Sequence, residues 1–429
     1  MRLGGRVQAA IEVLSDMEKR KRPVAEALRD WGKSHRFAGS GDRAAIGNIV
    51  YDALRNRAST CYLMDSDKSR RLVLGTLLRH WDFDAEKLAA AFDGDKFAPD
   101  LLNESEQKTF DQRDLDEAPL HVQGDIPEWC EASFEANFDE DWLKEAKAMT
   151  LRPPVDIRVN TLKSNRDKIA RALEKSGATP THLAGNGLRI KAGPGFYRQP
   201  NVQAEAGFQK GWFEIQDEGS QIVSELVYAK PGEQVLDFCA GAGGKTLALS
   251  AAMENKGQLH AYDSDKHRLK PIYERIKRAG TRNVQVHAPD DDLSALVGNM
   301  DKVVIDAPCT GSGTWRRRPD AKWRLSEENL AQRMQQQEEV LSQSSTFVRP
   351  GGCLIYITCS VLPEENENQV YSFCEDNSEF ELLSAGEVWQ EIYGFDKLQP
   401  WSSDMKCVTL TPASTNTDGF FFAVLGRKT

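Results

Sequence analysis

From residue 213 onward, short apolar segments alternate with amphipathic stretches, and this pattern constrains the fold more than any other feature of the 429-residue chain. The strand-like segments are residues 234–238, 257–263, 283–288, 302–307 and 352–358, and residues 244–254, 265–279, 326–347 and 364–376 have helical spacing. Strand–helix–strand order with almost continuously apolar strands predicts a parallel sheet covered by helices on both faces. A last apolar segment, 419–426, follows a long irregular stretch, and we expect it to close one edge of the sheet.

Two shorter parts precede this α/β region. Residues 6–80 carry apolar side chains at intervals of three and four, which predicts amphipathic helices. Residues 155–162 and 187–193 read as strands around a helical stretch at 164–176, which indicates a compact α+β unit. We therefore expect an all-α N-terminal domain at 1–124, a small α+β unit at 125–210 and a Rossmann-like α/β domain at 211–429.

The charge of the chain is unevenly distributed. The formal net charge is −10, which by itself argues against a nucleic-acid partner, because phosphate binding needs positive potential. Residues 1–80, however, contain 16 Lys and Arg against 9 Asp and Glu, whereas residues 81–150 contain 6 against 20. The basic first segment therefore keeps RNA open as a partner.

Cysteine usage and targeting signals indicate the compartment. The eight cysteines are scattered without a C-x-x-C pair, so neither a zinc ribbon nor any other metal site is predicted. The N-terminus has no secretory apolar segment, and no run approaches the ~18 apolar residues that span a bilayer. We expect a cytoplasmic protein with reduced thiols and no membrane association.

Polar residues gather where the predicted strands end, which is where ligands bind in open parallel sheets. The first strand ends at Asp237 and runs into a small-residue turn, 239–246, whose glycines let backbone N–H groups approach a ligand. Asp263 ends the second strand and is placed to accept hydrogen bonds from ribose hydroxyls. The third strand is followed by three aspartates, 290–292, one of which could bind an adenine amino group. These positions indicate an adenosine-containing cofactor.

Two other interpretations of the glycine turn compete with this one. Its GGKT sequence resembles a phosphate-binding loop, but that pattern requires a glycine where Cys239 stands. The glycines could also serve only close packing of a helix on the sheet. Neither alternative gives a role to Asp263 or to the cysteines at the later strand ends.

Two cysteines lie at neighbouring strand ends beside a carboxylate. Asp306 and Cys309 follow the fourth strand, and Cys359 ends the fifth within Thr358-Cys359-Ser360. Carbon 5 of cytosine becomes nucleophilic once a thiolate has added to carbon 6, and the same sulfur can leave afterwards. A carboxyl such as that of Asp306 would take up the charge that develops on the ring nitrogen. The residue types therefore suit methylation of cytosine.

Several segments together resemble the RNA 5-methylcytosine methyltransferases of the Sun/Fmu family. The resemblance covers about 125–429, and residues 1–80 are more weakly similar to the NusB-type helical RNA-binding domain of bacterial members. The segments are IRVNTLK (157–163), QDEGSQIV (216–223), DFCAGAGGKT (237–246), VVIDAPCTGSGTWRRRPD (303–320), YITCS (356–360) and TDGFFFAVLGR (417–427).

The resemblance implies an S-adenosylmethionine-dependent RNA (cytosine-5-)-methyltransferase. In this chain Cys359 would be the nucleophile and Cys309 would assist product release, with Asp306 as the third catalytic residue. Gly241-Ala242 departs from the Ala-Pro that is usual in the family, which loosens the turn without removing an N–H donor. The residues that would bind the cofactor are Cys239, Ala240, Gly241, Ala242, Gly243, Gly244, Lys245, Asp263, Asp290 and Asp306.

The substrate and partners are less constrained by the sequence. We expect ribosomal RNA as the substrate, with transfer RNA second, and a monomeric enzyme. Residues 315–318, Trp-Arg-Arg-Arg, are a candidate RNA contact, with arginines for phosphates and a ring for stacking on a base. Two alternatives remain open: a catalytically inert RNA-binding assembly factor, and a DNA methyltransferase in which Cys309 is the nucleophile.

Overall fold

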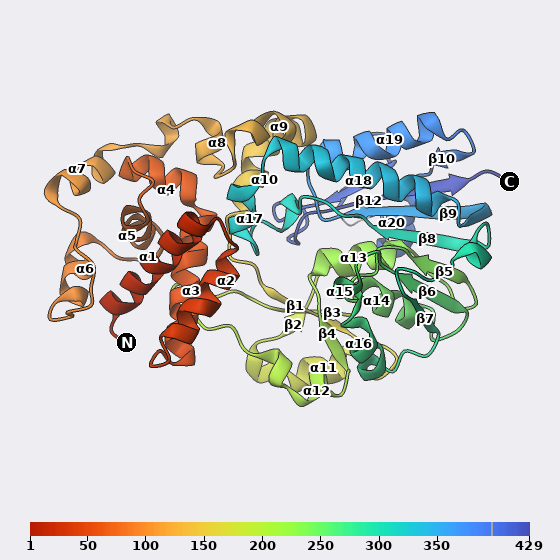
Figure 1. The fold of residues 1–429 in the computed structure, drawn as a ribbon, viewed down its shortest axis with the longest axis horizontal. Helices are drawn as coiled ribbons and strands as arrows, with labels where there is room; N and C mark the ends of the chain where they lie inside the picture. The colour runs from red at the N-terminus through yellow and green to blue at the C-terminus, as the bar shows by residue number, and fades with distance from the viewer. Residues whose placement is uncertain (396–397) are drawn as a thin grey trace. The chain divides into compact units, whose positions relative to one another are not determined.

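The computed structural model describes residues 1–395 and 398–429, and the chain divides into two compact units (Figure 1). The helical unit consists of Met1–Pro153, Ala192–Gln199 and Trp315–Leu325. The sheet unit consists of Pro154–Lys191, Pro200–Thr314 and Ser326–Thr429. Each unit has its own buried apolar clusters, so each is described by itself.

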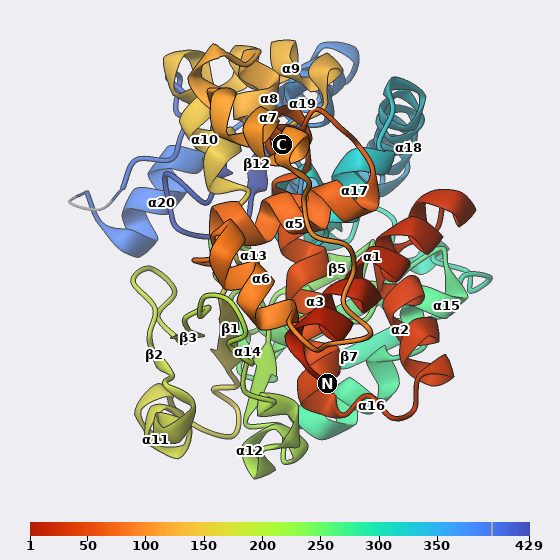
Figure 2. The same ribbon diagram turned by 90° about the vertical axis from the view of Figure 1, so that its left-hand side faces the viewer.

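The helical unit is built around three helices that pack against one another, α1, α3 and α5 (Figure 2). Their apolar stripes, predicted from intervals of three and four, form one buried cluster that includes Leu14, Ile49 and Leu72. The helices of this unit are α1 (Leu3–Arg20), α2 (Val24–Ser34), α3 (Ser40–Arg55), α4 (Arg57–Met64), α5 (Ser69–His80), α6 (Ala85–Phe92), α7 (Glu104–Gln112), α8 (Leu120–Gln123), α9 (Glu131–Phe138), α10 (Trp142–Ala148) and α17 (Pro319–Arg324).

Helix α17 reaches the helical unit from far along the sequence. The buried Lys322 donates from Nζ to the carbonyl of Arg55 at 3.2 Å, and Trp323 donates from Nε1 to the carbonyl of Leu54 at 2.6 Å. These bonds satisfy carbonyl groups in the last turn of α3, which receive no hydrogen bond from an N–H group of their own helix. A segment that follows the Asp306 strand therefore caps a helix of the N-terminal region.

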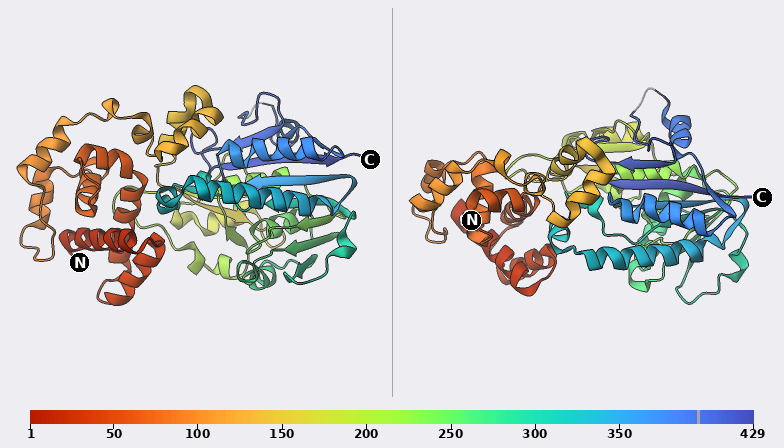
Figure 3. Two further views of the ribbon diagram at one scale, coloured as in Figure 1. Left: turned by 45° about the horizontal axis from the view of Figure 1, so that its top comes forward. Right: turned by 90° about the horizontal axis from the view of Figure 1, so that it is seen from above.

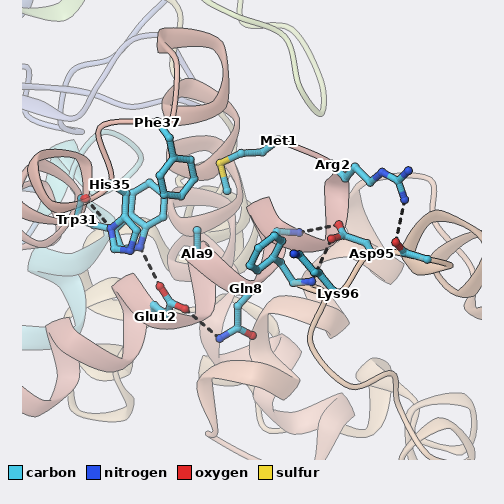
Figure 4. Close-up of a pocket in the computed structure, with 13 residues that line it drawn as sticks. Met1, Arg2, Gln8, Ala9, Glu12, Trp31, His35, Phe37, Asp95 and Lys96 are labelled. Carbon is cyan, nitrogen blue, oxygen red and sulfur yellow. Dashed lines mark hydrogen bonds between the residues drawn. The ribbon is translucent and has the colours of Figure 1, made fainter.

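The helical unit also contains a cavity of about 770 Å³ with aromatic walls (Figure 4). Trp31 and His35 stack there with 4.2 Å between ring centroids, and Trp31 donates from Nε1 to Glu12 at 2.9 Å. Phe37 and Phe97 also line the cavity and are 72% and 63% exposed. Exposed rings that line one cavity, rather than standing singly on the surface, form a candidate binding surface.

The sheet unit begins with a small antiparallel sheet in the strand order β2-β3-β1-β4. Its inner face packs on helix α11 (Arg166–Ala172) through a cluster that includes Ile157, Ile169 and Leu188. These elements lie within the range 125–210 that was expected to form a small α+β unit. The strands are β1 (Val155–Val159), β2 (Thr179–Pro180), β3 (Gly187–Ile190) and β4 (Phe213–Ile215), and helix α12 is Ala206–Gln209.

The larger sheet has the order β10-β12-β9-β8-β5-β6-β7, with β11 paired to β12. Strands β5 to β9 are parallel, and β10 to β12 run antiparallel to their neighbours. The predicted α/β class is confirmed, with a Rossmann-like parallel core. The strands are β5 (Gln234–Asp237), β6 (Gln258–Tyr262), β7 (Val284–His287), β8 (Met300–Asp306), β9 (Val348–Thr358), β10 (Phe380–Leu382), β11 (Cys407–Leu410) and β12 (Phe420–Arg427).

Helices cover both faces of this sheet (Figures 1 and 3). On one face Leu341 of α18 and Phe373 of α19 pack with the strands, and on the other face Ile222 of α13, Leu249 of α14 and Trp389 of α20 do so. Continuous apolar strands follow from burial on both sides. The helices are α13 (Glu218–Leu226), α14 (Gly244–Ala252), α15 (Lys266–Leu269), α16 (Ile272–Ala279), α18 (Glu327–Ser345), α19 (Glu367–Asp376) and α20 (Ala385–Tyr393).

Two expectations about the end of the chain are wrong. Strand β12 lies between β9 and β10 rather than at an edge, which explains why all residues from Phe420 to Leu425 are buried. The preceding stretch is not irregular, because it contains β10, α20 and β11. These elements are nine residues or shorter, so they give little periodicity for a sequence pattern to reveal.

No helix among residues 1–395 and 398–429 combines the length and apolar character that crossing a membrane requires.

Candidate active site

The turn after β5 shapes one wall of the site. Gly241 and Gly243 have φ of +50° and +82°, in the left-handed region that favours glycine. A Cβ on Gly243 would lie 2.5 Å from Cγ1 of Ile272, so this position also requires the absence of a side chain. Helix α14 starts at Gly244 directly after the turn, so its first N–H groups have no acceptor within the helix.

Asp263 holds this turn against the next strand. The Gly241 N–H donates to Oδ2 of Asp263 at 2.9 Å, and the Asp265 N–H donates to Oδ1 at 2.9 Å. The residue is 1% exposed, although each carboxylate oxygen can accept a further bond. Asp263, which was predicted to bind the ribose hydroxyls, thus also stabilises the turn.

Lys245 and Asp306 join the turn to the fourth parallel strand. Nζ of Lys245 lies 2.7 Å from Oδ2 of Asp306, and the lysine side chain is 6% exposed. Lys245 stands in the first turn of α14, and Asp306 is the last residue of β8. The sequence predicted both residues at the site, and the structure brings them into contact.

A cavity of about 250 Å³ opens between these groups. Asp237 lies at its base, fully buried, and accepts a hydrogen bond from Oγ1 of Thr246 at 2.7 Å. Burial raises the pKa of Asp237 to about 7, and the negative charge of Asp306 contributes. The lining residues are Gln216, Ser220, Asp237, Cys239, Ala240, Gly241, Ala242, Gly244, Lys245, Arg268, Arg275 and Asp306.

The donor and acceptor groups of this cavity fit S-adenosylmethionine. Among the described residues, Oδ1 of Asp237 is buried and has no hydrogen-bond partner. A buried carboxylate oxygen without a donor is costly, and an ammonium group such as that of an amino-acid moiety would supply one. Asp306 and Asp263 add negative potential that suits a sulfonium ion.

The three consecutive aspartates after β7 differ in their contacts. Asp291 accepts from the Ala288 N–H at 2.8 Å, and Asp292 accepts from the Ser294 N–H at 2.8 Å, so both stabilise their own loop. Asp290 instead lines a cavity of about 360 Å³ with Leu269 and other residues of α15. This arrangement favours Asp290 over its neighbours as the group available to a ligand.

The two cysteines meet at the ends of β8 and β9. Their Sγ atoms lie 3.4 Å apart, within hydrogen-bonding distance for sulfur. The strands are adjacent and parallel, and the Ala307 N–H donates to the Ile357 carbonyl at 2.8 Å. The contact with Cys359, together with burial, raises the pKa of Cys309 well above its ordinary value. Cys309 therefore keeps its proton beside the Cys359 sulfur.

Sequence reasoning assigned no role to several residues of the site. Gln216, Ser220, Arg268 and Arg275 line the cofactor cavity. Gln216 accepts from the buried Arg158 at 2.7 Å and donates to Ser220 at 2.9 Å. Gln216 and Ser220 belong to the QDEGSQIV segment, so its presence among the family motifs was the available signal.

The predicted RNA contact at 315–318 is largely wrong. Trp315 is 1% exposed and stacks on Phe134 with 5.8 Å between ring centroids, and Arg316 is 2% exposed. Within the segment Arg318 is exposed and Arg317 is half-buried. The segment is part of the helical unit. The tryptophan is buried there because a large aromatic ring contributes more stability by burial than a small side chain does.

Comparisons with known proteins place the chain in a family. The sequence model of the family "16S rRNA methyltransferase RsmB/F" matches residues 225–426. A second family model, for the ferredoxin-like domain of RsmF/B-like methyltransferases, matches residues 126–194. A protein of Synechocystis named "Probable ribosomal RNA small subunit methyltransferase B" is 30% identical over 320 residues, which cover 73% of this chain and 69% of that protein. The chain belongs to the RsmB/F methyltransferase family.

Further similarities agree with this RsmB/F assignment. Ribosomal RNA small subunit methyltransferase B of Cronobacter sakazakii is 32% identical over 309 residues, which cover 70% of this chain and 66% of that protein. A solved methyltransferase homolog from Pyrococcus horikoshii is 28% identical with a TM-score of 0.59, covering 72% of this chain and 97% of that one. The predicted family, methyltransferase activity and cofactor S-adenosylmethionine are confirmed.

Proposed function

We propose that this RsmB/F protein methylates carbon 5 of a cytosine in 16S ribosomal RNA through a covalent bond from Cys359 to carbon 6. The observation that carries the proposal is the 3.4 Å separation of the Cys309 and Cys359 sulfurs at the ends of adjacent strands. The cavity that contains Lys245 and Asp306 lies beside the same strand ends. S-adenosylmethionine, when bound, supplies the methyl group.

Cys359 acts as the nucleophile. Its thiolate adds to carbon 6, carbon 5 becomes electron-rich and takes the methyl group, and loss of the carbon-5 proton then lets the sulfur leave. A proton from the Lys245 ammonium passes through the Asp306 carboxylate to the ring nitrogen, where negative charge develops during the addition. The Lys245 ammonium holds the Asp306 carboxyl in place through the 2.7 Å ion pair.

Cys309 removes the proton from carbon 5. The largest cause of its raised pKa is the contact with Cys359. Once Sγ of Cys359 is bonded to carbon, it no longer interacts as a free thiol or thiolate, so the pKa of Cys309 falls. Cys309 can then release its proton to solvent and act as the base at the step where a base is needed.

The cofactor-binding roles predicted for residues 239–245, Asp263, Asp290 and Asp306 are part of the proposal. The glycine turn presents N–H groups, Asp237 accepts from an ammonium group, and Asp263 has free lone pairs for ribose hydroxyls. Asp290 binds the adenine amino group, which its position in the cavity beside Leu269 supports.

The N-terminal domain, predicted at 1–124, docks RNA. Support comes from the excess of basic residues in 1–80 and from the aromatic cavity that Trp31, His35 and Phe37 line (Figure 4). Phe37 and Phe97 of this cavity are exposed. Arg2 and Lys96 line the same cavity, so phosphates and an unpaired base could be bound together. The small α+β unit, predicted at 125–210, adds a second docking surface.

The enzyme acts as a monomer in the cytoplasm, where its eight free cysteines stay reduced. Bisulfite sequencing of total RNA from a deletion strain tests the substrate. We expect one cytosine of 16S ribosomal RNA to lose protection and to regain it with the wild-type gene but not with Cys359→Ala. Loss of protection in a transfer RNA would instead favour that substrate, and unchanged RNA would favour an inert assembly factor.

A further inference from the structure

The loops that carry the two cysteines are tied together by a buried network. The Gly313 N–H donates to the carbonyl of Cys359 at 3.0 Å, and the Ser312 and Ser360 hydroxyls lie 2.9 Å apart. These bonds connect the loop after β8 to the loop after β9. They do not by themselves fix the residues on either side of Cys309.

Glu365 supplies that connection. It is 0% exposed, accepts from the Thr310 N–H at 2.8 Å through Oε1 and accepts from the Thr310 hydroxyl at 2.5 Å through Oε2. The Ser360 hydroxyl lies close enough to this carboxylate to help lower its pKa against the effect of burial. Thr310 directly follows Cys309, and Ser360 directly follows Cys359. One buried carboxylate thus binds the residue after Cys309 and interacts with the residue after Cys359.

Gln337 of α18 extends the network to the residue before Cys309. Its Nε2 donates to Oε1 of Glu365 at 3.1 Å and to the carbonyl of Pro308 at 2.9 Å. Gln337 is also 0% exposed, so water does not compete for these bonds. The backbone on both sides of Cys309 is therefore held by side chains whose positions depend on Glu365.

A carboxylate suits this position better than a neutral side chain. All the groups that converge on Glu365 are donors: the N–H and hydroxyl of Thr310, the Ser360 hydroxyl and the Gln337 amide. Only a carboxylate accepts at both of its oxygens, and hydrogen bonds to a charged group are the stronger ones. Burial raises the pKa of Glu365, so these donors also offset the cost of its charge.

We propose that Glu365 is a positioning residue that sets the separation of the Cys309 and Cys359 sulfurs. The inference rests on the proposed function, because both cysteines are assigned roles there. Glu365 has no contact with the base or the methyl group in this assignment. It acts by keeping Cys309 within reach of the carbon that Cys359 has activated, and small displacements of a reacting group are costly to rate.

The first measurement needs neither RNA nor cofactor. Diamide oxidises two neighbouring thiols to a disulfide and is itself reduced to the hydrazine, so the rate of the Cys309–Cys359 disulfide reports how often the sulfurs meet. Peptide mapping distinguishes this disulfide from others. We expect Glu365→Gln to slow its formation by on the order of 10-fold. An unchanged rate would overturn the proposal.

The matched control is Glu225→Gln. Glu225 is a half-buried carboxyl of the same unit, burial raises its pKa as it does that of Glu365, and it accepts from the Tyr393 hydroxyl at 2.6 Å. We expect its disulfide rate to equal that of the wild type. Equal slowing in both variants would mean that loss of any buried carboxylate loosens the sheet unit, and the specific role of Glu365 would be wrong.

The second measurement follows turnover. Glu365→Gln should lower kcat, leave the KM for S-adenosylmethionine unchanged and accumulate a covalent RNA complex on ordinary cytosine, because product release depends on Cys309. If this variant does not fold, Thr310→Val serves in its place, because it removes one hydrogen-bond donor to Glu365 without changing the charge. Thr310→Ser keeps that donor and should restore the wild-type rate of turnover. A slowed disulfide with no RNA adduct in any variant would support the positioning role and reject the covalent mechanism.

Discussion

Lys245 and Asp306 form an ion pair with 2.7 Å between Nζ and Oδ2. Lys245 belongs to the first turn of α14, and Asp306 ends the strand that leads to Cys309. The lysine side chain is 6% exposed and the aspartate side chain is 37% exposed, so solvent screens the interaction from the aspartate side only. The cofactor turn and the cysteine loop are therefore linked through one partly buried pair.

Lys245→Met should lower kcat/KM for RNA methylation by about 10- to 100-fold, the equivalent of one charge-assisted hydrogen bond of about 1.5–3 kcal/mol. The reason is that Asp306 loses the group that orients its carboxyl. Steady-state methylation assays measure the effect. Lys256→Met is the matched control, because Lys256 pairs with Glu254 at the same 2.7 Å but with both side chains more than 60% exposed. Equal losses in the two variants would contradict the prediction.

Cys359→Ala should abolish turnover and any covalent adduct with RNA that contains 5-fluorocytosine, because the nucleophile is absent. Cys309→Ala should still allow addition and methyl transfer but should block release. It should therefore accumulate a covalent complex on ordinary cytosine, visible as a slowly migrating band in a denaturing gel. The 3.4 Å contact between the sulfurs makes this separation of roles testable within one site.

The opposite pattern, a trapped complex with Cys359→Ala and none with Cys309→Ala, would make Cys309 the nucleophile and favour the DNA-type arrangement. Absence of an adduct with the wild type and with both variants would reject covalent catalysis. The 5-fluorocytosine control is informative because fluorine at carbon 5 cannot leave as a proton does.

Asp263→Ala should weaken S-adenosylmethionine binding by about 10- to 100-fold, because hydrogen bonds to a charged acceptor contribute about 1.5–3 kcal/mol each. Part of the loss would come from release of the Gly241 N–H, which the carboxylate accepts at 2.9 Å. Calorimetric titration measures the affinity. The control is Asp292→Ala, which removes the acceptor of the Ser294 N–H. This variant should bind S-adenosylmethionine with wild-type affinity. Unchanged affinity in the Asp263 variant would remove this residue from the site.

Cofactor affinity should increase as the pH rises from 6 to 8. Burial raises the pKa of Asp237 to about 7, so its carboxyl is mostly protonated at pH 6 and mostly ionised at pH 8. A cationic ligand favours the ionised form, so binding at pH 6 should release protons. Titration calorimetry in buffers of different ionisation enthalpy detects the release. Asp237→Asn should bind with little dependence on pH, and equal wild-type affinity at pH 6 and pH 8 would refute the assignment.

Phe37→Ala should weaken RNA binding by about 5- to 100-fold, since stacking of one base on a ring contributes about 1–3 kcal/mol. Cofactor affinity should not change. Phe37 is 72% exposed, and Phe395→Ala in the sheet unit, at 73% exposure, is the matched control. Filter binding at several salt concentrations measures the effect. Deleting residues 1–124 is a poorer test, because it also removes Asp52, which accepts a hydrogen bond from Arg152 at 3.0 Å. The deletion would therefore disturb residues that remain in the chain. RNA affinity equal to the wild type would exclude Phe37 from the docking surface.

Some structural features could not be predicted from local patterns. Trp315 begins a basic-looking motif, yet it is buried against Phe134, about 180 positions earlier in the chain. Strand β12 reads as a terminal strand but lies inside the sheet, because its position depends on which neighbours it pairs with. Glu365 looks like a surface acid in a polar stretch and is fully buried by partners from three separate segments.

The sequence by itself determined the α/β class, the methyltransferase family and the set of strand-end residues that gather at one edge of the sheet. It could do so because parallel strand–helix order forces the carboxyl ends of the strands to one side. Only the tertiary structure decided the 3.4 Å contact of the two sulfurs, the Lys245–Asp306 pair and the role of Glu365. These depend on packing between segments far apart in the chain, and side-chain separations of a few ångströms are set by that packing rather than by local periodicity.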